Sequence, residues 1–340
     1  MHLKKLLITS TIIAATSISN NTVADIKISG EQEWNYLDAG GSFKSTLGSS
    51  TSFTFTGTGD LSNGISYLVK FTLEDGDQSY RAITFDLGSG LKLGIGYDQS
   101  YGIETVKAIS PYVNNRRAHI TGAHRGFPTA ARKPLGPDVW DTSSLENAIG
   151  LSFKNDLAAI SFGFTPVRDV NTSTDEIAAS SATSSEYGTA SSIGVKLTPV
   201  DGLTIGFGTS SEESDATANS DPKGTTIGFQ YKIGSFAIGY QEIENELDDT
   251  TTQRVTTTEI QEGGVAYKVN DALTIGVFAA NINYLTVNTD NGVETGMGIV
   301  QVGYNLGPAV IQYDYADGSD LNSTKDTEYE IHKVKIKVRF

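Results

Sequence analysis

The sequence predicts an all-β fold, a sixteen-stranded antiparallel transmembrane β-barrel. Three observations lead to this prediction. Residues 327–340 alternate between charged and apolar side chains, segments with the same period of two recur along the chain, and the connections between them are short at one end and long at the other. Successive side chains of a strand point to opposite faces, so each segment has one polar and one apolar face. In a membrane barrel the apolar face contacts lipid, while the polar face lines a water-filled lumen.

The N-terminal segment has the features of a secretory signal. Two early lysines precede an apolar stretch over residues 6–15, and small residues precede a predicted cleavage after Ala24. The apolar stretch is too short for a membrane-spanning helix, which needs about 20 residues. We therefore predict a signal peptide over residues 1–24 and a single exported barrel domain over residues 25–340.

Charge and composition exclude several function classes. Residues 1–24 carry two lysines and no acid, so the remainder has 23 basic and 40 acidic residues, a net charge of −17. This balance argues against nucleic acid as a partner, because phosphate backbones attract basic surfaces. The chain has no cysteine, which excludes disulfide scaffolds and thiol chemistry. Its few histidines form no recognisable catalytic or zinc-binding set, so we predict neither enzymatic activity nor a bound cofactor.

Period-two segments bounded by turn residues define the predicted strands. In the last of them Lys333, Lys335, Lys337 and Arg339 alternate with apolar residues before the aromatic Phe340. Glycines such as Gly206 and Gly208 lie inside strands, where a barrel permits bends and close neighbour contact. The predicted strands lie near residues 26–36, 51–59, 65–74, 79–88, 91–97, 146–154, 157–165, 187–198, 202–211, 223–233, 235–245, 254–269, 272–285, 293–305, 308–316 and 327–340.

Connection lengths and aromatic residues favour a membrane barrel over a soluble sandwich. Turns such as 155–156 and 270–271 are short, whereas 167–186 and 212–222 are long, and outer-membrane barrels keep their short turns on the periplasmic side. Aromatic residues gather near strand ends on the apolar face and predict two interfacial girdles, although aromatic residues also favour strands in soluble proteins. The residues concerned are Trp34, Tyr36, Phe85, Tyr97, Phe153, Phe164, Tyr240, Tyr267, Tyr304, Tyr315 and Phe340.

One long insertion, residues 98–145, interrupts the strand pattern. It spans about 48 residues and holds four prolines, and connections of this length are usually functional or disordered. Apolar residues such as Tyr101, Ile109, Val113 and Trp140 argue against a solvated coil. The insertion follows the fifth predicted strand and is the third of the long connections.

The strand count, the loop order, the long third loop and Phe340 together resemble the sixteen-stranded, trimeric general diffusion porins of Gram-negative bacteria. The resemblance covers residues 25–340 and implies a water-filled channel for passive diffusion of small hydrophilic solutes and ions across the outer membrane. It also implies a homotrimer in contact with membrane lipid and lipopolysaccharide, with residues 98–145 folded into the lumen as the constriction. In this family Phe340 would act as an assembly signal.

The resemblance also suggests which residues line the channel. In general porins this loop commonly carries acids opposite a basic cluster on the wall, whereas here the loop is rich in arginine and no arginine ladder is evident on strands two to four. We therefore expect a mixed-charge constriction that favours anions, although some of these arginines could instead brace the loop. The expected constriction residues are Asp98, Glu104, Lys107, Arg116, Arg117, Arg125, Arg132 and Lys133, and the expected wall residues are Glu31, Glu33, Lys70, Lys92, Lys333, Lys335 and Lys337.

Two other functions stay open. A solute-specific channel for phosphate or another anion would suit the arginine-rich loop, and a secreted all-β binding protein is disfavoured by the sorted loops and Phe340. Acidic residues expected in the outer loops would gather cations at the mouth or bind Ca²⁺ that bridges to lipopolysaccharide, or simply form a solvated surface. They are Glu212, Glu213, Asp215, Glu242, Glu244, Glu246, Asp248 and Asp249. The connection at 75–79 is too short to latch a neighbouring barrel, so a trimer would depend on apolar wall packing.

Overall fold

The computed structural model describes residues 25–39, 45–97, 101–106, 109, 113, 148–165, 189–213, 223–246, 255–286, 289–319 and 328–340. The predicted signal peptide, residues 1–24, and much of the long insertion lie outside these residues. The strands are β1 (Asp25–Ala39), β2 (Thr46–Asp60), β3 (Ser66–Glu74), β4 (Asp77–Gly88), β5 (Leu91–Tyr97), β6 (Ala148–Lys154), β7 (Ala158–Thr165), β8 (Ala190–Leu197), β9 (Leu203–Glu212), β10 (Lys223–Ile233), β11 (Phe236–Glu246), β12 (Val255–Lys268), β13 (Leu273–Thr286), β14 (Thr289–Asn305), β15 (Ala309–Ser319) and β16 (Glu328–Arg339).

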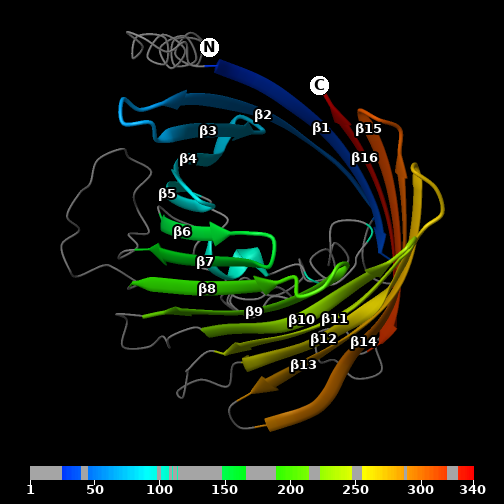
Figure 1. Cartoon of the computed structure of the whole chain (residues 1–340). Helices are drawn as coiled ribbons and strands as arrows, with labels where there is room; N and C mark the ends of the chain where they lie inside the picture. The colour runs from blue at the N-terminus through cyan, green and yellow to red at the C-terminus, as the bar shows by residue number, and fades with distance from the viewer. Residues whose placement is uncertain are drawn as a thin grey trace, which may run out of the picture.

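These strands form one closed antiparallel barrel (Figure 1). Each strand pairs with its neighbours in the chain, and β1 pairs with β16 to close the ring. The predicted fold class is confirmed. The one helical segment among the described residues is a single 3₁₀ turn, η1 (Gly102–Thr105). No helix in the described part of the chain is long and apolar enough to cross a membrane.

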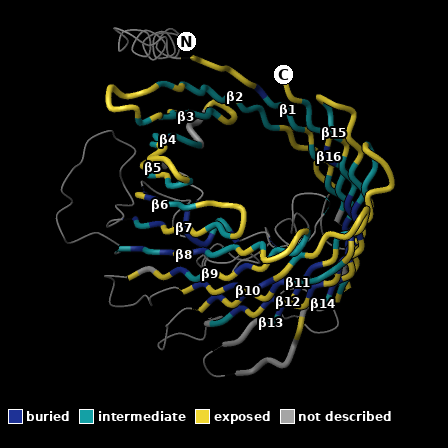
Figure 2. The backbone as a smooth tube through the Cα atoms, viewed as in Figure 1, coloured by how far each residue is buried: buried dark blue, intermediate teal, exposed yellow. Residues whose placement is uncertain are grey.

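The two faces of each strand differ in the way that the alternating sequence predicts. Ile95 and Ile149 on neighbouring strands are 44% and 45% exposed on the outside of the ring, whereas Gly94 and Gly150 between them face inward. Along β10–β13 buried and exposed positions alternate residue by residue (Figure 2). An exposed apolar face around the ring suits contact with lipid hydrocarbon, and closure leaves no unpaired strand edge there.

Strand lengths divide the barrel into a low side and a tall side. The strands β5–β8 have seven or eight residues, whereas β12 and β13 have 14 and β14 has 17. Since a strand rises about 3.3 Å per residue, the tall side extends well beyond the low side at the end of the long connections. The connection between β3 and β4 is also short, a two-residue turn at Asp75 and Gly76, where the backbone N–H of Thr51 donates to the Asp75 carboxylate over 2.7 Å.

The last residue closes the seam between β1 and β16. The backbone N–H of Gly30 donates to the carbonyl of Phe340 over 2.8 Å, and the N–H of Phe340 donates back to Gly30 over 3.0 Å. The Phe340 ring covers Gly30 on the outer face and meets Phe53 edge to face, with ring centroids 6.1 Å apart. A Cβ at position 30 would overlap the ring, so a larger residue there has to displace Phe340.

Candidate functional site

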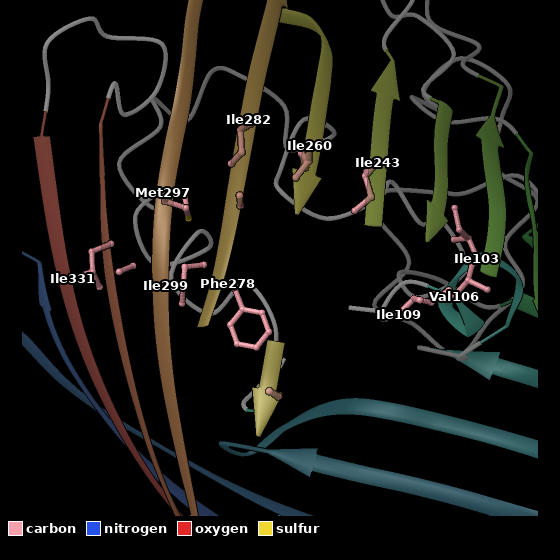
Figure 3. Close-up of a cluster of buried hydrophobic side chains, with 13 residues drawn as sticks. Ile103, Val106, Ile109, Ile243, Ile260, Phe278, Ile282, Met297, Ile299 and Ile331 are labelled. Carbon is pink, nitrogen blue, oxygen red and sulfur yellow. The ribbon is translucent and has the colours of Figure 1, made fainter. Parts of the chain in front are cut away.

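The inside of the barrel has two halves with different chemistry. We call the inner faces of β6–β14 the loop-side wall and the inner faces of β16 and β1–β5 the charged wall. The loop-side wall carries glycines, isoleucines and glutamines, and the beginning of the long insertion lies against it. Figure 3 shows Ile103, Val106 and Ile109 of the insertion together with the isoleucines of this wall. The charged wall carries hydroxyl groups, carboxylates and lysines.

Glycines on the loop-side wall and the adjoining strand β5 make room for the base of the insertion. The Tyr101 ring lies directly over Gly94 and Gly150, so a Cβ at either position would overlap it. A Cβ at Gly208 would lie 2.6 Å from Cγ2 of Val106 and 2.7 Å from Cγ1 of Ile103. Ile103 and Val106 are fully buried as a result. The strand glycines therefore have a specific role here, which is to admit another part of the chain close to the wall.

Polar side chains of the same wall bind the backbone of the insertion. On β7, Ser161 Oγ accepts a hydrogen bond from the backbone N–H of Gly102 over 2.9 Å. Further along, Gln241 Oε1 accepts the N–H of Ile109 over 3.4 Å, and its Nε2 donates to the carbonyl of Val106 over 3.3 Å. These bonds satisfy backbone groups that the irregular loop cannot pair with itself, which buried main chain requires.

The insertion continues across the wall to β14. Gln301 Oε1 accepts the N–H of Val113 over 3.1 Å, and a Cβ at Gly276 on β13 would lie 2.7 Å from Cγ2 of Val113. Between Tyr101 and Val113 the described residues of the insertion thus contact strands from β5 to β14 on the inside of the ring. The described base of the predicted loop lies in the lumen, and residues 114–147 lie outside the described part.

A belt of apolar side chains covers the tall part of the loop-side wall and reaches β16. Ile260 and Ile282 are fully buried, and Ile299 is 1% exposed, all on inner faces of neighbouring strands. Sequence reasoning did not expect apolar residues here, because it assigned apolar side chains to lipid. The sequence of β13 did contain a signal for this belt, because the adjacent residues Val277 and Phe278 are both apolar although one faces out and the other faces in. Strands that are covered on both faces lose the alternation of polar and apolar residues.

The charged wall is centred on a row of ion pairs across the β1–β16 seam. Lys335 Nζ lies 2.9 Å from Glu33 Oε1, and Lys337 Nζ lies 2.6 Å from Glu31 Oε1 and 3.3 Å from Glu33 Oε2. Arg339 Nε donates to Glu31 Oε2 over 3.2 Å. Three cations thus pair with two carboxylates, which leaves the seam with one net positive charge.

The seven expected wall residues lie on the inner face. Glu31, Glu33, Lys335 and Lys337 form the seam pairs, and Lys333 stands opposite the inner Asp314 in the β15–β16 register. Lys70 and Lys92 face inward from β3 and β5. Among the expected constriction residues, Glu104 lies half-buried in η1. The others, Asp98, Lys107, Arg116, Arg117, Arg125, Arg132 and Lys133, lie outside the described residues.

The structure corrects the expected place of four acidic residues. Glu212 is the last residue of strand β9 rather than part of a loop. Glu242, Glu244 and Glu246 lie on strand β11 rather than in a loop, and they alternate with the inward Ile243 and Asn245. They therefore face the outside of the barrel at β11 and not the channel mouth. Glu242 accepts a hydrogen bond from the Tyr240 hydroxyl over 2.6 Å. The strand continues so far because β12 pairs with it as far as Glu246.

Comparison with known sequences decides the family. A family profile described as Gram-negative porin matches residues 9–322, which is most of the chain. The chain belongs to the Gram-negative porin family. This porin is therefore an outer-membrane channel for passive diffusion, and its family and fold are those of a channel rather than of an enzyme. No curated protein sequence matches it.

Solved structures of the same fold cover nearly the whole porin. A trimer form of OmpT, an outer membrane protein of Vibrio cholerae, is 14% identical with a TM-score of 0.66, over 94% of this chain and 100% of that one. An anion-selective porin from Comamonas acidovorans is 12% identical with a TM-score of 0.63, over 94% and 100%. A porin structure refined at 1.8 Å is 15% identical with a TM-score of 0.62, over 93% and 100%. At such identities the likeness concerns the fold.

Proposed function

We propose that small hydrophilic solutes and ions cross this porin between the loop-side wall and the charged wall. The observation that carries the proposal is the division of the lumen. The loop base occupies the wall with the glycines and glutamines, and the ionic and hydroxyl side chains stand on the opposite side. Water and ions prefer the polar wall, because an unpaired charge loses hydration against an apolar surface. No chemical step belongs to this function.

The constriction in this proposal is formed by the insertion and by the seam row. Glu104 and the charged residues of the insertion that lie outside the described part would act on passing ions from one side. Glu31, Glu33, Lys335 and Lys337 would act from the other side, with Lys70, Lys92 and Lys333 along the same wall. Charges in a narrow aqueous path sort ions and orient dipolar solutes.

The proposed assembly is a homotrimer in the outer membrane, surrounded by lipid and lipopolysaccharide. The OmpT structure described as a trimer form supports it, and so does the exposed apolar surface around the ring. The two-residue turn at Asp75 and Gly76 leaves no loop to reach into a neighbour, so wall packing would hold the trimer. Calcium bound at acidic residues near the long-loop end stays part of this proposal as a bridge to lipopolysaccharide.

A second candidate is a channel selective for anions. Six basic residues of the insertion support it, and so does the likeness to a porin described as anion-selective. The acidic side chains of β11 do not argue against it, since they face outward.

Planar-bilayer recording of the refolded porin tests both candidates. We expect water-filled pores whose conductance steps come in multiples of three, and a salt gradient gives the ion preference from the sign of the reversal potential. If protein whose circular dichroism spectrum shows folded β-structure gave no conductance, the proposed path between the two walls would be contradicted. A strong cation preference would leave the channel in place and eliminate the anion-selective form.

A further inference from the structure

We infer an oxyanion-binding subsite on the charged wall, formed by Lys27 of β1 and Lys70 of β3 on either side of Thr56 of β2. It rests on the proposed function, because it lies on the proposed solute path, and it names one class of solute that this path would retain. Inorganic phosphate is the simplest member of that class. We call these three residues the lysine row.

Strand register brings the three residues of the lysine row together. Lys27 is paired with Thr56, and Thr56 is paired with Lys70, so all three point to the same face at the same height. Neighbouring strands are about 4.8 Å apart, which separates the two lysine Cα atoms by about 10 Å. Flexible lysine side chains easily span half of that distance, so both ammonium groups can reach one anion above Thr56.

Hydroxyl groups frame the lysine row on the side of the long connections. The next inward row consists of Ser29, Thr54 and Thr72, and the Thr54 and Thr72 hydroxyls lie 3.0 Å apart. Strand β2 continues this pattern, since its inward positions from Ser50 to Thr58 are all serine or threonine. Hydroxyl groups donate to anionic oxygens, and lysine supplies charge without a fixed direction, so the combination suits phosphate, sulfate or a carboxylate.

The carboxylates of this wall lie in other rows and leave the lysine row positive. Glu31 stands two rows away, beside Ser52 and Glu74, and the seam cations Lys337 and Arg339 neutralise it. Asp25 lies in the adjacent row with Thr58 and Leu68. Among the described residues no ion pair joins Lys27 or Lys70 to a carboxylate. Lys27 and Lys70 outnumber the nearby Asp25 two to one, so this part of the wall has a net positive charge that attracts anions.

Neighbouring side chains position Lys70 without neutralising it. Its Nζ lies 4.3 Å from the centre of the Tyr80 ring, a cation–π contact that holds the ammonium group near the wall and keeps its charge. Register then continues from Lys70 through Ala82 to Gly96 of β5. Gly94, two residues before Gly96, supports the Tyr101 ring. The lysine row thus shares a register row with Gly96, which lies two residues from the contact between β5 and the base of the insertion.

Single-channel recording in chloride with added phosphate tests the subsite. We expect phosphate to reduce the chloride current of the unaltered porin in a saturable way. The double variant Lys27→Gln/Lys70→Gln should raise the half-blocking phosphate concentration roughly tenfold, because two attractive charges are lost. The double variant Lys27→Arg/Lys70→Arg keeps both charges and should retain the block.

Lys223→Gln is the matched control, because Lys223 is exposed on the outer face of β10 and should leave the block unchanged. A circular dichroism spectrum typical of β-strands and a heat-dependent shift in gel mobility confirm that each variant is folded. Equal block in the unaltered porin and the Gln double variant would overturn the subsite, and so would the absence of any block in a conducting pore. Absence of conductance in the unaltered, folded porin would instead contradict the proposed function itself.

Discussion

The loop-side wall and the charged wall are built from the same antiparallel strands, yet they hold different contents. On the loop-side wall glycines leave space at Gly150 and Gly208, as Gly94 does on the adjoining β5, and glutamines bind loop backbone. On the charged wall many inward positions carry ionic or hydroxyl side chains such as Glu33 and Thr54. Strand pairing thus forms the barrel, and the side chains at inward-facing positions determine whether the insertion or water lies against each wall. Two substitutions test this difference, and two more test features outside the inner walls.

The largest effect is expected from Gly208→Val on the loop-side wall. The new side chain would overlap Val106 and Ile103, whose atoms lie 2.6 Å and 2.7 Å from a Cβ at this position. Overpacking of this kind costs roughly 1–3 kcal/mol and should push the loop base toward the channel axis. We expect a lower step conductance in planar bilayers. Gly57→Val is the control, because a Cβ at Gly57 meets no atom within 4 Å; equal conductance of both variants would place the loop base elsewhere.

Glu33→Gln tests the charged wall. It removes the carboxylate that Lys335 and Lys337 share at 2.9 Å and 3.3 Å. Hydrogen bonds to charged groups contribute roughly 1.5–3 kcal/mol each before compensation, so the seam should unfold at lower urea concentration. The freed cations should also move the reversal potential toward anion preference. An unchanged reversal potential would mean that the seam row does not face the ion path.

Gly30→Val tests how the seam closes on the lipid side. The added side chain must displace the Phe340 ring, which is 67% exposed and can swing away. Loss of the edge-to-face contact with Phe53 should cost about 1 kcal/mol, the usual value for an aromatic pair. We expect a slightly lower unfolding temperature in detergent and an unchanged reversal potential. Phe340→Ala should lower that temperature by a similar amount, and additive losses in the double variant would contradict a shared contact.

Asp271→Asn lies outside both walls and should have the smallest effect. Lys268 Nζ is 2.8 Å from Asp271 Oδ1 in the turn between β12 and β13, and this hydrogen bond lowers the pKa of the Asp271 carboxyl. A lowered folded-state pKa means that the pair stabilises the turn above the ordinary pKa, and that this is lost as the pH falls through the lowered one. Because the group is fully exposed, we expect indistinguishable acid unfolding curves. A clear difference would mean that this turn limits stability.

The sequence predicts the strands well because their boundaries have local causes. Turn residues and alternation place β5 at 91–97 and β10 at 223–233, as the structure has them. The predicted start of β14 at residue 293 was wrong, because pairing with β13 carries the strand from Thr289 through a register shift. Here a tertiary partner extends the strand beyond its predicted boundary.

The site was harder to predict because it depends on contacts across the ring. The sequence identified the long insertion and the inward lysines, yet it gave no reason to select Gln241 or Gln301 as loop anchors. Those glutamines are 132 and 188 residues from the loop residues that they bind. The seam pairs were also missed, because Glu31 and Lys337 become neighbours only when the ring closes. Sequence patterns describe faces, whereas such contacts require the register between distant strands.

The seam has a consequence for how this chain folds. Arg339 binds Glu31, which lies 308 positions away in the sequence, and the Gly30–Phe340 backbone pair has a similar separation. Joining such distant segments carries a large loop-closure entropy, and contacts of high sequence separation slow folding. Strand β1 therefore keeps an unpaired edge until β16 pairs with it. An unpaired edge promotes aggregation during that interval, so we expect this chain to need a chaperone between export and membrane insertion.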